Sequence, residues 1–121
     1  AHIGFLLVRP DARYWVRTSP NKIFEYLVCG TVPIIRADVD HADRLRACSL
    51  IFDREDEGAM IVQAVLDLLG SPEKLERYMG NARALGLDYT WESVACRYID
   101  LYTALLYPKT APNHPNALSM R

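Results

Sequence analysis

The chain has 121 residues, of which 50% are hydrophobic and 24% are charged, a composition typical of one soluble globular domain and not of a disordered chain. Its 14 Lys and Arg against 15 Asp and Glu give a net charge of −1, which excludes the basic excess that binding to a nucleic-acid backbone requires. The cysteines, Cys29, Cys48 and Cys96, lack metal-ligand spacing, so we expect reduced thiols in a cytoplasmic compartment.

The first part of the chain has the pattern of two strands joined by a helix. Residues 3–8 and 32–37 are short apolar runs typical of parallel strands that are covered on both faces, and 49–52 is a weaker third candidate. Pro33 lacks a backbone donor, so we expect it near the start of its strand or at an edge. Between the first two strands, the sequence predicts a helix over residues 19–30.

Both ends of this first helix are marked in the sequence. Ser19 is a typical N-cap, Pro20 suits the first helical position, and Gly30 suits the position just past the helix end. The strand, helix and strand together predict an α/β fold with parallel strands.

The remainder of the chain is predicted to be mainly helical. Helical patterns cover residues 56–69, 72–86 and 91–107, and residues 108–121, with three prolines and no periodicity, read as a tail or linker. The last helix has a broad apolar stripe, which we expect to pack on another surface. Two or three strands are few, because an open sheet has about five to six on average. We therefore expect more sheet upstream or in a partner, and a chain that begins inside a longer protein.

The helix over residues 19–30 divides into an apolar side and a polar side at roughly 100° per residue. The apolar side contains Ile23, Phe24, Leu27 and Val28, and the polar side contains Asn21, Lys22, Glu25 and Cys29. The polar residues begin at a helix N-terminus that follows a strand, where free N–H groups and the helix dipole favour an anion.

Two interpretations of the polar side remain open from the residues alone. In the first, Lys22 and the amides of residues 21–23 bind an anion, Arg13 and Arg17 assist from the preceding loop, and Glu25 accepts hydrogen bonds from a vicinal diol. In the second, the side is merely solvated, and Lys22 and Glu25 form an i, i+3 ion pair worth about 0.2–0.5 kcal/mol. Chemistry alone favours the second.

A second group of polar residues follows the second predicted strand. Asp38, Asp40, His41 and Asp43 could suggest a divalent cation, but a polar loop after a buried strand is the interpretation that we favour. No serine or cysteine has the partners of a catalytic nucleophile in the sequence, and no phosphate-loop motif is present.

The order of motifs along residues 1–106 resembles the C-terminal half of retaining glycosyltransferases of the GT-B fold. The stretches that carry the resemblance are HIGFLLV, SPNKIFEYLVCGTVPIIRAD, LLGSPEKLERYMGNAR and YTWESVACRYIDLYTALL. The second of these matches a family segment of the form S-P-x-K-x-x-E-Y-x-x-x-G-x-P-V-[IV].

The resemblance implies roles for the first helix. Glu25 corresponds to the carboxylate that binds the ribose hydroxyls of the nucleotide. Lys22, Asn21, Ser19 and Pro20 would lie beside the diphosphate and sugar of the donor, and residues 91–106 correspond to a last helix that crosses back towards the N-terminal domain.

This sequence departs from the family pattern at several positions. Arg17 stands where many members have a second glutamate, and Asp40 and His41 stand where a Gly-Gly pair is common. The family's upstream Arg and Lys and its acceptor-binding domain have no counterpart in the chain, and the catalytic residues are therefore unassigned.

The sequence thus predicts a partial Rossmann-like domain over residues 1–107, the C-terminal part of a GT-B fold, followed by the tail 108–121. The resemblance implies transfer of a sugar, with retention, from a nucleotide-diphosphate sugar to a glycan or lipid-linked acceptor. It implies no metal or other cofactor, a partner in the missing N-terminal domain or another chain, and a cytoplasmic enzyme that could work at the membrane face. The alternatives are a non-catalytic Rossmann-like interaction module and a sugar-nucleotide epimerase.

Overall fold

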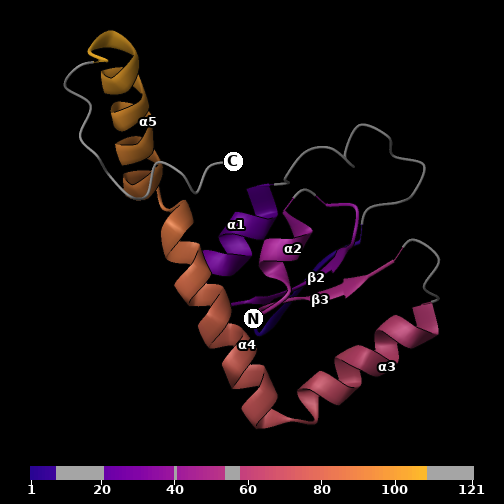
Figure 1. The fold of residues 1–121 in the computed structure, drawn as a ribbon. Coiled ribbons are helices and arrows are strands. Elements are labelled where there is room, and N and C mark those ends of the chain that lie inside the picture. Colours follow the sequence, from indigo (N-terminus) through magenta and orange to yellow (C-terminus); the bar gives the residue numbers. More distant parts are fainter. Residues whose placement is uncertain (8–20, 40, 54–57, 109–121) are drawn as a thin grey trace. The chain divides into compact units, whose positions relative to one another are not determined.

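The computed structural model describes residues 1–7, 21–39, 41–53 and 58–108, and these form an α/β fold (Figure 1). A three-stranded parallel sheet has the order β1-β2-β3. The strands are β1 (Ile3–Leu6), β2 (Val32–Arg36) and β3 (Leu50–Phe52). The chain divides into two units, Ala1–Leu87 and Asp88–Arg121.

The middle strand β2 is buried on both faces, as its apolar sequence predicts. Its residues 32–35 are all buried, and it pairs with β1 from Ile3↔Val32 and with β3 from Ile34↔Leu50. Pro33 is the second residue of β2, near the strand start as expected. Because pairing with β3 begins one residue later, the missing N–H of Pro33 costs no bond of that ladder.

Helix α1 (Asn21–Val28) follows β1 and ends as the sequence predicts. Gly30 has φ 67°, and its amide donates to the Leu27 carbonyl at 2.9 Å, while the next amide reaches the carbonyl of Tyr26 at 2.8 Å. This is the Schellman arrangement, in which the left-handed residue favours glycine. The predicted helix start at residues 19 and 20 lies outside the described residues.

The apolar side of α1 is narrower than predicted. Ile23 and Leu27 are buried and Phe24 is half-buried, but the side chain of Val28 is 48% exposed. At roughly 100° per residue, Val28 lies about 140° around the helix from Ile23, at the margin of the apolar side, which accounts for its exposure.

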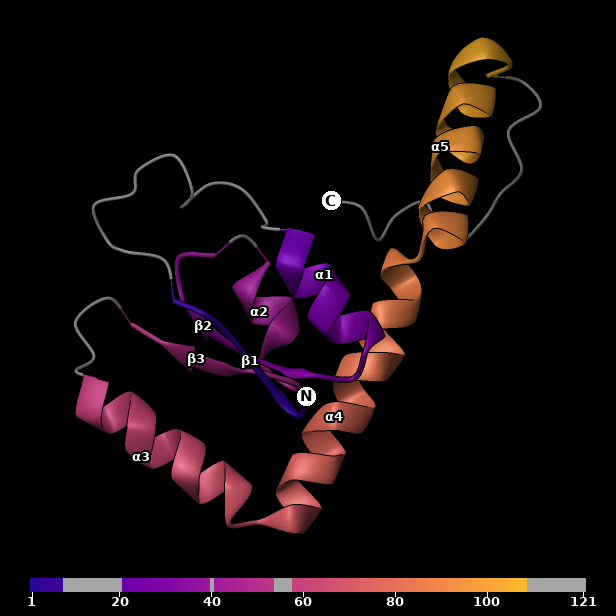
Figure 2. The same ribbon diagram turned by 180° about the vertical axis from the view of Figure 1, so that it is seen from behind.

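A short helix, α2 (Ala42–Leu45), follows β2 where the sequence analysis expected a polar loop. Ala42 and Leu45 are buried one turn apart, and both Val39 before the helix and Cys48 after it are also buried. One turn is too short to show a helical period, which explains why the pattern did not reveal it. Helices α1 and α2 cover one face of the sheet (Figure 2).

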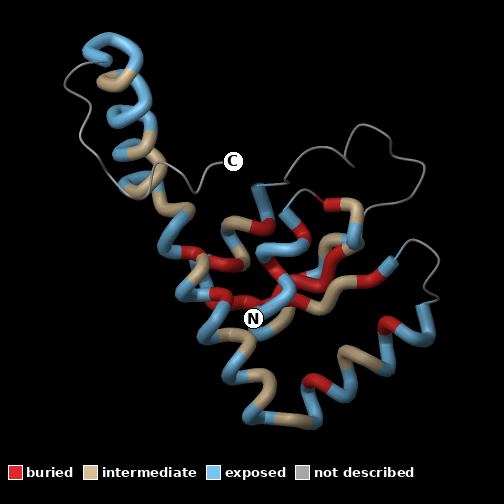
Figure 3. The backbone as a smooth tube through the Cα atoms, in the orientation of Figure 1, coloured by how far each residue is buried: buried red, intermediate tan, exposed pale blue. Residues whose placement is uncertain are grey.

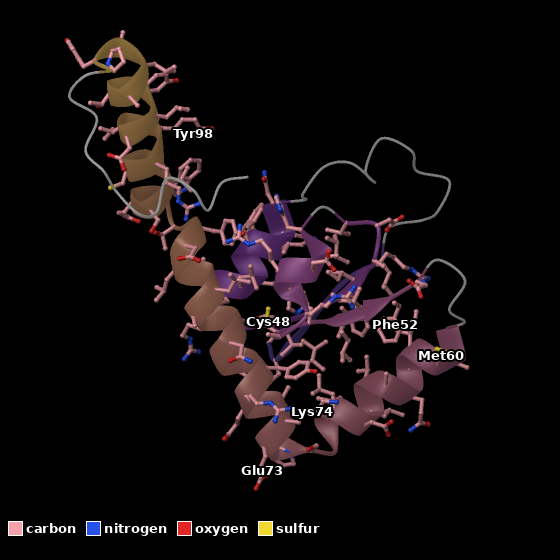
Figure 4. All side chains as sticks on the ribbon, in the orientation of Figure 1. Cys48, Phe52, Met60, Glu73, Lys74 and Tyr98 are labelled. Atoms are coloured by element: carbon pink, nitrogen blue, oxygen red, sulfur yellow. The ribbon has the colours of Figure 1, made fainter. Side chains whose placement is uncertain are left out.

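Helices α3 (Gly58–Leu69) and α4 (Pro72–Gly86) are both predicted, and α3 and the first half of α4 cover the other face. The core on this face joins residues of β2, β3 and α3 (Figures 3 and 4). Its buried members are Val32, Ile34, Phe52, Ile61 and Leu68. The first half of α4 adds partly buried side chains to this core, namely Leu75, Tyr78 and Met79.

The second half of α4 packs against the end of α1. Ala82 is fully buried, and a Cβ added to Gly86 would lie 2.7 Å from the carbonyl carbon of Leu27. The Asn81 side-chain amide donates to the carbonyl of Ala47 at 2.8 Å. Because α1 ends and β3 begins at the amino edge of the sheet, this contact holds α4 at the amino edge.

The second unit contains α5 (Trp91–Leu106), which matches the predicted helix to within one residue. Its N-cap is Thr90, whose hydroxyl oxygen accepts from the amide of Ser93 at 3.2 Å, as expected for this residue type. No residue of α5 is buried within the described part of the chain. No helix among the described residues has the length and apolarity needed to cross a bilayer.

Candidate functional site

The amino end of α1 lies at the carboxyl edge of the sheet, because α1 directly follows β1 in a parallel arrangement. The strands end at this edge with Leu6, Arg36 and Phe52. Helix α4 packs at the opposite edge, against the last turn of α1. The first turn of α1 is therefore positioned where parallel α/β sheets bind ligands, outside the carboxyl ends of their strands.

Three of the predicted site residues lie on this helix and are exposed. Asn21 and Lys22 are in the first turn, and Glu25 is one turn further along, about 6 Å from Asn21 along the axis at 1.5 Å per residue. Ile23 and Leu27, on the opposite side of the same helix, are buried. Packing of these two apolar residues thus fixes the direction in which the polar side of α1 faces.

Lys22 and Glu25 do not form an ion pair with each other among the described residues. Within the described part of the chain, the pair has no nitrogen–oxygen contact within 4.0 Å, whereas Arg46 and Asp43 form such a contact at 3.0 Å. The i, i+3 ion pair that the solvated interpretation expects is thus not formed.

The other predicted site residues lie outside the described residues. These are Ser19 and Pro20, at the predicted helix start, and Arg13 and Arg17, in the segment between β1 and α1. Their roles stay predictions.

The carboxyl edge also carries a contact that the sequence analysis did not single out. The Arg36 guanidinium donates from Nη1 to the carbonyl oxygen of Asp53 and so links the ends of β2 and β3. The signal in the sequence is a basic residue at the end of an apolar strand, a position that parallel topology places at this edge.

His41 has a left-handed backbone, with φ 67° and ψ 14°, just before α2. Among the described residues, no other residue with a side chain has a positive φ. Left-handed backbone costs a residue with a Cβ roughly 1–2 kcal/mol relative to glycine.

The acidic residues after β2 do not assemble into a metal site in the part of the chain that is described. No group of three or more His, Cys, Asp or Glu side chains there could hold a metal ion. Asp43 instead accepts a hydrogen bond from Arg46 Nε at 3.0 Å, and Asp40 lies outside the described residues.

The cysteines are free thiols in the structure, as predicted. Cys48 is buried, and burial raises the pKa of its thiol, while a contact with the Ser49 hydroxyl acts in the opposite direction (Figure 4). A thiol with a raised pKa is protonated at neutral pH, which makes Cys48 a packing residue and not an activated nucleophile.

Comparison of the chain with protein-family models, with curated proteins and with solved structures gave no match. The assignment of a function therefore depends on the residues and on the geometry of the carboxyl edge.

Proposed function

We propose that residues 1–107 form the nucleotide-binding part of a retaining glycosyltransferase with a GT-B fold. The complete enzyme would transfer a sugar from a nucleotide-diphosphate donor to a glycan or a lipid-linked acceptor. The observation that carries the proposal is the exposed stripe of Asn21, Lys22 and Glu25, which begins at a helix N-terminus on the carboxyl edge of a parallel sheet. The α/β layers are compatible with a partial Rossmann-like fold.

In this proposal, different groups of α1 bind different parts of a nucleoside diphosphate. The positive end of the helix dipole and the ammonium group of Lys22 attract the diphosphate. Glu25, one turn deeper, accepts hydrogen bonds from both hydroxyls of the ribose. Lys22 and Glu25 are separated by about 4.5 Å along the helix axis, which suits a ribose and the phosphate bonded to it.

Two further observations support this proposal over a solvated helix face. Lys22 and Glu25 do not pair with each other within 4.0 Å, so each can bind a ligand without first breaking an ion pair. The left-handed backbone of His41 fits the glycine-rich position of the family pattern.

In this proposal, the chain stabilises the negative charge that grows on the diphosphate as the bond to the sugar breaks. Preorganised donors and positive charge at the leaving group lower the barrier because they require no rearrangement during the reaction. The donor sugar nucleotide is a co-substrate, and no metal ion is needed. The N-terminal domain or a partner chain supplies the acceptor site, packs on α5, and completes an enzyme of the cytoplasm or its membrane face.

Titration of the chain with nucleoside diphosphates, followed by calorimetry or NMR, tests the binding site. A hydrogen bond to a charged group contributes about 1.5–3 kcal/mol, so Glu25→Ala should weaken binding of uridine, guanosine or adenosine diphosphate at least tenfold. Glu76→Ala is the matched control, because this exposed glutamate lies on α4. Equal affinity of the two variants would refute the role of Glu25.

A non-catalytic interaction module is the second candidate, and the exposed apolar residues of α5 favour it. Trp91 is 85% exposed and Leu105 is 69% exposed, and with Tyr98 they share one face of the helix, as expected for an apolar patch that packs on another protein. A chain that binds none of the three nucleoside diphosphates would favour this candidate. An epimerase would also bind the nucleotide. Conversion of a sugar nucleotide by the full-length protein, without transfer of the sugar to an acceptor, would distinguish an epimerase from a glycosyltransferase.

A further inference from the structure

We draw no further inference here: the strongest candidate, the exposed apolar face of α5 around Trp91, Tyr98 and Leu105, is an unpartnered helix face, and nothing among the described residues shows what covers it.

Discussion

The contact between α1 and α4 positions the candidate site, and a matched pair of glycine substitutions tests it. Gly86 ends α4 beside the last turn of α1, and Gly80 lies inside the same helix. A Cβ at position 86 would lie 2.7 Å from the Leu27 carbonyl carbon and the Val28 amide nitrogen. Because these are main-chain atoms, only separation of the two helices relieves the contact.

The expected loss of stability in Gly86→Ala follows from this distance of 2.7 Å. Carbon atoms pack at about 3.5–4.0 Å, so α4 has to move by roughly 1 Å at its end. Overpacking of this kind costs about 1–3 kcal/mol, and the gain in helix propensity is small at the last residue of a helix. We therefore expect Gly86→Ala to lower the free energy of unfolding by about 1–3 kcal/mol.

The control substitution, Gly80→Ala, should change the free energy of unfolding in the opposite direction. No atom lies within 4 Å of a Cβ added to Gly80, so the same substitution there introduces no clash. Alanine reduces the conformational entropy of the unfolded chain, and Gly80→Ala should raise the free energy of unfolding by about 0.4–1 kcal/mol.

Urea unfolding monitored by far-UV circular dichroism measures both effects, and equal m-values would show that the variants differ in stability alone. Each kcal/mol corresponds to about 4–8 °C in Tm for a domain of 60–100 residues. Equal stability of Gly86→Ala and Gly80→Ala would show that the two helices are not in main-chain contact, contrary to the structure.

Three further changes test other parts of the fold. His41→Gly should raise the free energy of unfolding by about 1 kcal/mol, since it removes a left-handed residue that has a Cβ; a lower urea midpoint would contradict this. Gly4→Ala should destabilise β1, because the new Cβ would lie 2.6 Å from the Tyr26 ring. In a Tyr26→Ala background, Gly4→Ala should lower the free energy of unfolding by less. A double-mutant cycle without coupling energy would exclude the contact between position 4 and the Tyr26 ring. Burial raises the pKa of Cys48, so the folded state holds this proton more tightly than the unfolded state. Stability should therefore fall as the pH rises through the usual range of a thiol, by more in the wild type than in Cys48→Ala; equal slopes would show that the thiol does not contribute.

The strand, helix and strand at the start of the chain could be predicted because each boundary has a local cause. Gly30 marks the end of α1 through its positive φ, and the apolar run of β2 reflects burial on two faces. The polar side of α1 follows from helical geometry alone. These features depend on residues that are neighbours in sequence, so a pattern can reveal them.

Features that depend on distant residues could not be predicted. The close approach of Gly86 to the main chain of Leu27 and Val28 joins residues that are far apart in sequence and meet only in the folded chain. The one-turn helix α2 contains two buried residues, Ala42 and Leu45, too few to distinguish a helix from a loop. The link from Arg36 to the Asp53 carbonyl likewise requires β2 and β3 to be adjacent.

The two-sided burial of β2 makes the α/β unit cooperative. Val32 and Ile34 contact the core formed with α3 and α4, while Pro33 and Ile35 face the layer of α1 and α2. Detachment of either layer would therefore expose the same strand to water, and neither layer can melt alone at low cost. The β2 amides should be among the slowest of the chain to exchange with deuterium, whereas α5, which buries no residue in the described chain, should lose its protection through local opening.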